Sequence, residues 1–190
     1  NADPSDIVVT AAGGLVGEVA QVWKPKQINT FETDWGYSCM GYEISGALGI
    51  KMAKPKQEVV VFVGDGSYLL NNSDIYSSIL YEKKLIIVVC DNSGHMVINR
   101  LQLAKGGKEY LCNLKTSRAT NFIEVDFAAH AASMGAETET VTSTSELESA
   151  FLRAKKSNKT YVIALKTHGY EWLEGTAFWE SPTLEVSSTD

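Results

Sequence analysis

Residues 58–67 read EVVVFVGDGS, and residues 85–94 read LIIVVCDNSG. In each stretch a continuous apolar run is followed at once by a turn with an acidic or amide side chain. Continuous β-branched runs are typical of parallel strands that are covered on both faces. Ligands of parallel α/β sheets bind beyond the carboxyl ends of the strands. We therefore expect both turns to face one shared ligand.

The rest of the chain alternates between apolar runs and helical patterns. Strands are predicted over 7–12, 58–63, 85–90, 137–141 and 160–166, and helices over 17–23, 40–53, 73–81, 125–134 and 145–156. Ser145, with Glu148 three residues later, has the pattern of a capping box at the start of the last helix. The polar stretch Ala104–Asn121 is predicted to be a mobile loop. Together the elements predict an α/β fold with an open, mostly parallel sheet and helices on both faces.

Composition limits the class of protein. The chain has 190 residues, 44% of them hydrophobic, and a net charge of −6, which predicts one domain with a sizeable core. Scattered Lys and Arg argue against nucleic-acid binding, and no apolar run approaches the ~20 residues that span a membrane. Cys39, Cys90 and Cys112 lack metal-ligand spacing and are predicted to be free thiols in the cytoplasm.

The two turns carry the chemistry of a metal and phosphate site. Gly64 and Gly66 let a ligand approach the backbone, while Asp65 offers a carboxylate and the amides at Gly66 and Ser67 begin a helix. Asn92 and the carbonyl of Gly94 offer further oxygens, and such a set suits Mg²⁺. Either turn alone is also a common structural turn. Their pairing, each after a buried strand, favours a site.

The paired turns resemble the signature of thiamine-diphosphate-dependent enzymes, in which Gly-Asp-Gly is followed further along by Asn-Asn. Here Asp91 replaces the first Asn, and Asn92 retains the second. The resemblance implies the thiamine-diphosphate-binding fold and the cofactors thiamine diphosphate and Mg²⁺. It also implies that Asp65, Asn92 and the carbonyl of Gly94 bind the metal.

Two further segments share this resemblance. Residues 11–23 (AAGGLVGEVAQVW) are similar to the family's first strand–turn–helix, which implies that amides near Gly14 and Leu15 contact the far phosphate. Residues 37–53 (YSCMGYEISGALGIKMA) are similar to the segment that binds the aminopyrimidine ring. There the carbonyl of Ser38 would accept a hydrogen bond from the ring's amino group, and Met40 would wedge between the two rings. For Met40, ordinary packing at a helix start is the alternative.

Four segments are most similar to family members that hydrolyse a cyclic 1,2-diketone in myo-inositol breakdown. These are residues 35–53, 63–75, 98–102 and 176–187. Acetolactate synthases are similar in the first two segments only. An acetolactate-synthase-like carboligase or decarboxylase and a non-catalytic nucleotide- or metal-binding module stay open as alternatives. A P-loop is excluded, because GxxxxGK[ST] does not occur.

His95 follows the metal loop directly, is assigned to the cofactor site and could also face the substrate. A histidine there departs from the family pattern. His130 is predicted to lie in the core or on a helix surface, whereas His168 could reach a site. Arg100, Gln102 and Arg118 flank the predicted loop, which could close over the substrate.

Family enzymes use a second domain, which binds the pyrimidine ring and supplies a glutamate. A chain of 190 residues leaves no room for that domain. We therefore expect residues 1–190 to be one diphosphate-binding domain, a C-terminal piece of a longer chain that starts without Met. The resemblance implies a homodimer or tetramer, a small diketone substrate, and a piece that is inactive alone.

Overall fold

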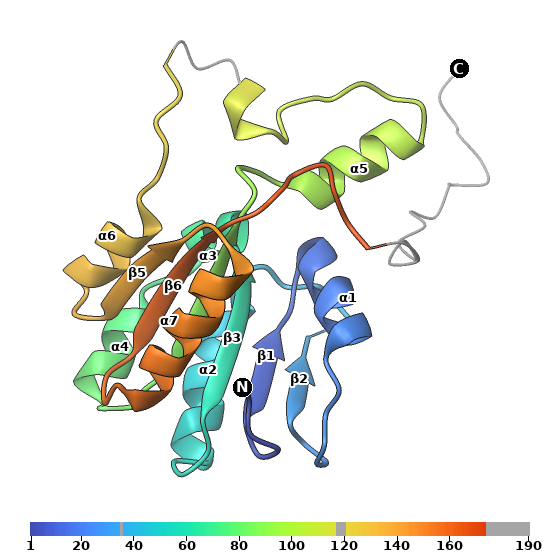
Figure 1. Ribbon diagram of the computed structural model, residues 1–190. Helices are drawn as coiled ribbons and strands as arrows, with labels where there is room; N and C mark the ends of the chain where they lie inside the picture. Colours follow the sequence, from blue (N-terminus) through green and yellow to red (C-terminus); the bar gives the residue numbers. More distant parts are fainter. Residues whose placement is uncertain (35, 117–120, 174–190) are drawn as a thin grey trace.

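A computed structural model describes residues 1–34, 36–116 and 121–173 of the chain. Arg118, a predicted flank of the loop, and the segment 176–187, one of the four similar segments, lie outside these residues. Within the described part, six parallel strands form one open sheet in the order β2-β1-β3-β4-β6-β5 (Figure 1). Their bounds are Ile7–Thr10 (β1), Phe31–Thr33 (β2), Val59–Gly64 (β3), Ile86–Asp91 (β4), Glu137–Val141 (β5) and Tyr161–Lys166 (β6). The α/β fold class is confirmed.

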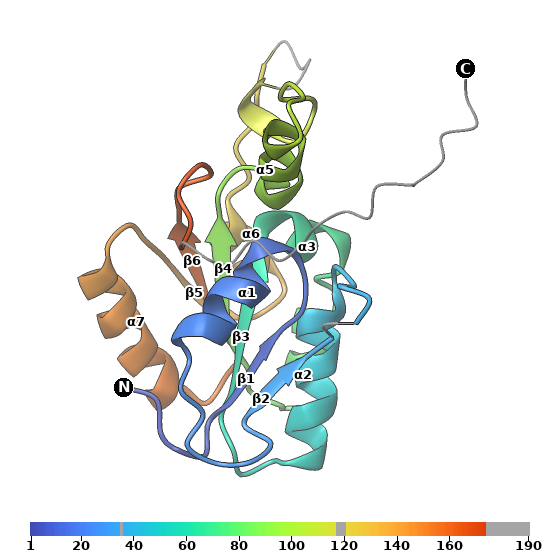
Figure 2. The ribbon, with the colours of Figure 1, turned by 90° about the vertical axis from the view of Figure 1, so that its right-hand side faces the viewer.

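Helices cover both faces of this sheet. Figure 2 shows α7 on one side of the strands and α2 on the other, while α5 lies beyond the carboxyl ends of the strands. The helices are Gly13–Val22 (α1), Tyr42–Ala53 (α2), Asp65–Leu70 (α3), Asp74–Leu80 (α4), Met96–Ala104 (α5), Phe127–Ser133 (α6) and Thr144–Lys156 (α7), with a 3₁₀ turn at Leu114–Thr116 (η1).

The continuous apolar strands are explained by two separate cores. Val61 of β3 packs into the core that contains Ile44 of α2, and the next strand contributes Ile87 to the same side. Val60 points to the other face and packs into the core that contains Ala150 of α7. Because alternate residues of β3 and of β4 enter opposite cores, the central positions of these two strands are all apolar.

The structure differs from the sequence prediction in two short elements. Strand β2 was not predicted, and α5 covers residues 96–103, for which no element was predicted, together with Ala104, the first residue of the predicted loop. The three residues of β2 are all half-buried, so they carry no apolar alternation, and their pairing with β1 is decided by tertiary contact.

The predicted capping box is wrong by two residues. Ser143, not Ser145, is the N-cap of α7, and its side chain accepts a hydrogen bond from the backbone N–H of Glu146. The carboxylate of Glu146 in turn accepts the N–H of Thr142 at 2.8 Å. The pair Ser143 and Glu146 has the same spacing as the predicted Ser145 and Glu148, so the motif alone did not fix the register.

Two further predictions concern thiols and membranes. All three cysteines are free, with Cys39 exposed, Cys90 half-buried and Cys112 buried. No helix among residues 1–34, 36–116 and 121–173 is long and apolar enough to cross a bilayer.

Candidate cofactor and metal site

A cavity of about 230 Å³ lies at the carboxyl end of the sheet, where the strand order reverses between β1 and β3. Parallel α/β sheets bind ligands at such a switch point. The turns after β1 and β3, the loop before α2 and the loop after β4 form its walls. It is lined by every residue that the sequence assigned to cofactor or metal: Gly14, Leu15, Ser38, Met40, Gly64, Asp65, Gly66, Ser67, Asn92, Gly94 and His95.

Asp65 joins the two turns directly. It is the first residue of α3 and only 2% exposed. One carboxylate oxygen accepts the N–H of Gly66 at 2.9 Å, and the other accepts the N–H of Gly94 at 2.8 Å. Burial and, to a smaller extent, the nearby charge of Asp91 raise the pKa of Asp65 to about 6. A bound cation would favour the ionised form of this carboxylate.

Asn92 supplies an unpaired oxygen to the same cavity. Its side-chain carbonyl oxygen is buried and has no hydrogen-bond partner among the described residues. An unpaired buried acceptor costs about 1–3 kcal/mol, so such a position is explained most simply by a ligand. The neighbouring turn is held by Asp91, whose carboxylate accepts the N–H of Ser93 at 2.9 Å.

Gly94 is required by close packing. A Cβ on this residue would lie 2.1 Å from the carbonyl oxygen of Cys112, and the backbones of Gly94 and Asn113 form an isolated antiparallel bridge. Only glycine can therefore place its backbone at this point of the cavity wall.

The donor set fits Mg²⁺ held together with a phosphate ligand. The described residues contain no group of three or more His, Cys, Asp or Glu side chains that could hold a metal ion. A carboxylate, an amide oxygen and a backbone carbonyl are hard ligands, and Mg²⁺ is commonly bound by few protein groups together with substrate phosphates and water. Asp65, Asn92 and Gly94 could thus hold the ion only as part of a larger complex.

Two helix N-termini offer a place for the phosphates. Gly13 begins α1 and Met96 begins α5, and both residues line the cavity. Neither helix has an acidic residue in its first turn, and neither N-cap side chain makes a capping hydrogen bond. Free N–H groups and the positive end of the helix dipole bind anions, so the arrangement suits a phosphate group.

Met40 and His95 cover the middle of the cavity. A Cβ on Gly66 would lie 2.6 Å from the His95 ring and 3.4 Å from the terminal methyl group of Met40. Both side chains therefore lie against Gly66, from different loops. Met40 keeps 40% of its surface exposed, as a side chain that touches a ligand requires. Ser38, in the same loop, has a left-handed backbone with φ of 50°.

The charge at Asp91 is compensated by a residue that the sequence analysis did not single out. Lys166 of β6 donates to the Asp91 carboxylate at 2.6 Å and also pairs with Glu124. The two residues are direct neighbours in the parallel register of β4 and β6. This position, where the family signature has an asparagine, thus holds a buried carboxylate with its own cation.

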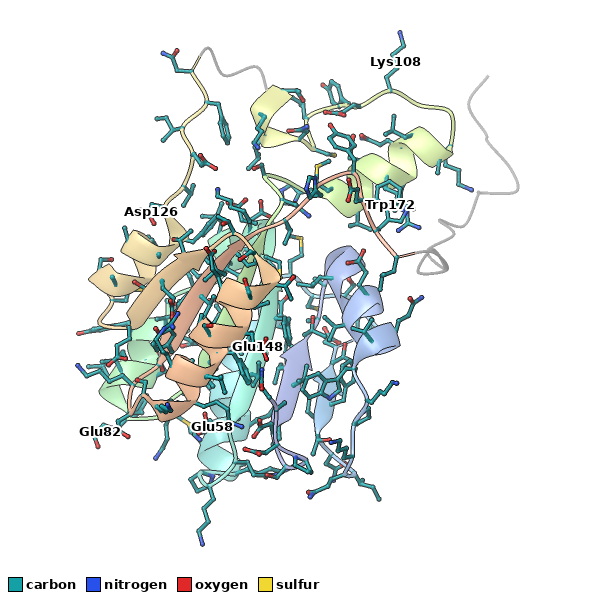
Figure 3. All side chains as sticks on the ribbon, in the orientation of Figure 1. Glu58, Glu82, Lys108, Asp126, Glu148 and Trp172 are labelled. Atoms are coloured by element: carbon teal, nitrogen blue, oxygen red, sulfur yellow. The ribbon has the colours of Figure 1, made fainter. Side chains whose placement is uncertain are left out.

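The other histidines lie outside this cavity. His130 is exposed on α6, and its Nδ1 lies 2.9 Å from the hydroxyl of the buried Tyr68. The prediction of a helix-surface residue is therefore confirmed. His168 lines an adjoining cavity of about 320 Å³, in which Arg100 lies 4.4 Å above the ring of Trp172. Figure 3 shows Trp172 close to α5.

The predicted loop after α5 is irregular over residues 105–113 and is held at Glu109. Its carboxylate accepts hydrogen bonds from the hydroxyls of Thr116 and Tyr170, at 2.9 Å and 2.8 Å. Gln102 contributes its side-chain oxygen to the N–H of Tyr110 at 3.3 Å. Lys108 extends from this segment beyond the carboxyl edge of the sheet (Figure 3).

A switch-point cavity with an oxygen-rich metal position and two anion-binding helix starts is the site of a diphosphate-binding α/β domain. Residues 11–165 match the family described as thiamine pyrophosphate enzyme, C-terminal TPP binding domain. The chain belongs to this family, so it is a domain that binds thiamine diphosphate.

Curated relatives narrow the comparison to one group of enzymes. The chain is 38% identical to the 3D-(3,5/4)-trihydroxycyclohexane-1,2-dione hydrolase of Halalkalibacterium halodurans, and the match covers 99% of this chain and 30% of that protein. It is 37% identical to the enzyme of the same name from Bacillus licheniformis over 99% of the chain, and 39% identical to that from Lacticaseibacillus casei over 98%. The chain spans about 30% of the length of these relatives.

Proposed function

We propose that this chain is the cofactor-binding part of an enzyme that opens 3D-(3,5/4)-trihydroxycyclohexane-1,2-dione by hydrolysis of a C–C bond, yielding 5-deoxy-glucuronate in myo-inositol catabolism. The observation that carries this proposal is the gathering of Asp65, the unpaired oxygen of Asn92 and two uncapped helix starts at one cavity. The relatives' shared name supplies the substrate.

In this proposal each wall of the cavity has its own role. Asp65, Asn92 and the carbonyl of Gly94 would hold Mg²⁺, which would neutralise the charge of the diphosphate. The amides near Gly14 and Leu15, together with that of Ser67, would bind phosphate oxygens, and Gly66, whose N–H is held by Asp65, would let the ligand approach the backbone. Among the described residues of this lining there is no Lys or Arg, so the metal and the backbone dipoles would supply the positive charge.

At the other end of the cavity, Ser38 and Met40 would orient the rings. When bound, thiamine diphosphate supplies the electron sink that C–C cleavage beside a carbonyl needs. Met40 would hold the rings by contact with its flexible thioether side chain. His95, which lies against Gly66, would offer the one imidazole ring among the described residues of this cavity to the substrate side.

A second domain would complete the site. The relatives are longer than this chain, and the family implies a partner domain that binds the pyrimidine ring. We propose that this domain comes from the same longer chain or from a neighbouring subunit of a homodimer or tetramer, and that this chain is inactive without it. A cytoplasmic location remains part of the proposal.

The proposal is tested on the full-length protein with thiamine diphosphate and Mg²⁺. We expect hydrolysis of the cyclic dione and no carboligation of pyruvate; the opposite preference would favour an acetolactate-synthase-like enzyme. Calorimetry with thiamine diphosphate and with ADP distinguishes these two kinds of enzyme from a nucleotide-binding module. Equal affinity for the two ligands would contradict a thiamine-diphosphate site.

The metal position is tested by Asp65→Ala in the full-length protein. We expect cofactor binding that depends on Mg²⁺ to fall by at least about a hundredfold, because the variant loses a charged ligand and the link between the two turns. Asp74→Ala, in the first turn of α4 outside the cavity, is the matched control. An unchanged affinity in Asp65→Ala would rule out this ligand assignment.

A further inference from the structure

Glu43 is an almost fully buried carboxylate behind the cofactor cavity. It lies in the first turn of α2 and is 1% exposed. It does not line the cavity, and no cationic side chain pairs with it among the described residues. Its partners are instead hydrogen-bond donors from three separate segments.

These donors come from three walls of the cavity. The hydroxyl of Ser67 shares its one proton between both carboxylate oxygens, at 2.8 Å and 2.9 Å. The N–H of Gly41 lies 3.0 Å from one oxygen, and the N–H of Ala12 lies 3.3 Å from the other. One side chain therefore connects the turn after β1, the loop that carries Met40, and the start of α3.

Gly41 is fixed on both sides by this arrangement. Its N–H is shared between Glu43 and the Ser67 hydroxyl, which accepts it at 2.8 Å. Its carbonyl accepts the side-chain N–H of Asn71 at 3.1 Å. The residue has a left-handed φ of 92°, and a Cβ would lie 2.8 Å from that of Asn71. The backbone directly after Met40 is therefore held by the side chains of Glu43, Ser67 and Asn71.

Stability alone does not explain a carboxylate at this place. Burying an ionised group costs several kcal/mol, and a well-packed apolar residue of similar volume is often equally or more stabilising. Local choices that contradict this rule concentrate at functional sites. Here the carboxylate satisfies donors that belong to the cavity walls, so its benefit lies in fixing those walls relative to one another.

We propose that Glu43 is a positioning residue, which sets the distance between the ring-binding loop at Met40 and the phosphate- and metal-binding walls at Ala12 and Ser67. It acts through these segments and touches neither cofactor nor substrate. The inference rests on the proposed thiamine-diphosphate site, since it concerns the placement of the two ends of that ligand.

The test is Glu43→Gln in the full-length protein. Glutamine keeps the size of the side chain but replaces one of the two acceptor oxygens with an N–H₂ group. That group is a donor and cannot accept the hydrogen bonds that the lost oxygen accepted. We expect the dissociation constant for thiamine diphosphate with Mg²⁺, measured by calorimetry without substrate, to rise at least about tenfold. At saturating cofactor kcat should fall, while KM for the dione stays within about twofold.

A matched control separates positioning from stability. Asp6 is also buried, at 3% exposure, and its carboxylate is hydrogen-bonded, but it precedes β1 at the opposite end of the sheet. Asp6→Asn should lower the melting temperature and leave the cofactor dissociation constant unchanged. A rise of similar size in Asp6→Asn and Glu43→Gln would overturn the proposal, because it would show a general effect of destabilisation.

A second variant keeps the inference testable if Glu43→Gln does not fold. Ser67→Ala removes the hydroxyl that bonds both Glu43 and Gly41, while the Ala12 and Gly41 N–H groups still reach the carboxylate. We expect a loss of cofactor affinity in the same direction. Wild-type affinity in the folded variant would contradict the inference, whereas failure of the wild type itself to bind thiamine diphosphate would contradict the proposed function instead.

Discussion

Asp65 gives the site a dependence on pH that can be worked out from its surroundings. Its pKa is raised to about 6 in the metal-free protein, first by burial and then by the charge of Asp91. Protons compete with Mg²⁺ for this carboxylate. We expect the affinity for Mg²⁺ with the cofactor to be constant above about pH 7 and to fall about tenfold per pH unit below about pH 6. Calorimetry across pH 5–8 measures this.

The variant Asp91→Asn is the control for this prediction. It restores the residue of the family signature and removes a carboxylate whose charge raises the pKa of Asp65. The fall in affinity should therefore begin at a lower pH than in the wild type. Lys166, which loses one partner, keeps its pairing with Glu124 and is 40% exposed. An affinity that does not change between pH 5 and pH 8 would contradict the assignment of Asp65 as the titrating ligand.

Residues in the two turns were predictable because each follows a strand within a few positions. The position of Asp65, Asn92 and Gly94 at one cavity was predicted in this way. Glu43 was not, since nothing in its local sequence reveals donors that come from Ala12 and Ser67, 31 and 24 residues away. Only the folded chain brings those segments together, and a single sequence contains no local pattern for a buried carboxylate of this kind.

Helix α7 provides a test at the level of one element. Ser143→Ala removes the N-cap and should lower the free energy of unfolding by about 1 kcal/mol. Ser145→Ala lies inside the helix, two residues away, and should change it by less than about 0.5 kcal/mol. Urea denaturation of both variants makes the comparison. A larger loss of unfolding free energy in Ser145→Ala than in Ser143→Ala would instead support the capping box predicted from the sequence, Ser145 with Glu148.

Elements with a strong pattern were predicted, and elements without one were not. Strands β3 and β4 are unbroken apolar runs because both faces of each are buried, which leaves a clear pattern in the sequence. Strand β2 has three half-buried residues, and only its pairing with β1 makes it a strand. No element was predicted over residues 96–103, where helix α5 forms at the edge of the cavity.

At the scale of the whole molecule, the two ends of the cavity differ in how far this chain encloses them. Asp65 and Ser67 are 2% and 4% exposed, whereas Met40 is 40% and Tyr37 is 89% exposed. The end at Asp65 and Ser67, where we propose the metal and the phosphates, is thus enclosed by this chain, while the end at Met40 and Tyr37 opens outward. The matched region covers only 30% of the relative from Halalkalibacterium halodurans, and we propose that a further domain in the full-length protein covers the rings.

This asymmetry predicts how the isolated chain binds. With Mg²⁺ present, residues 1–190 should bind thiamine diphosphate and plain diphosphate with affinities within about tenfold of each other, since the rings find few contacts. The full-length protein should prefer thiamine diphosphate by at least about a hundredfold, because burial of an aromatic ring contributes on the order of 3 kcal/mol. Calorimetry with both ligands on both proteins, after circular dichroism has confirmed that the isolated chain folds, makes the comparison. A full preference in the isolated chain would place the ring contacts within these 190 residues and contradict the need for a second domain.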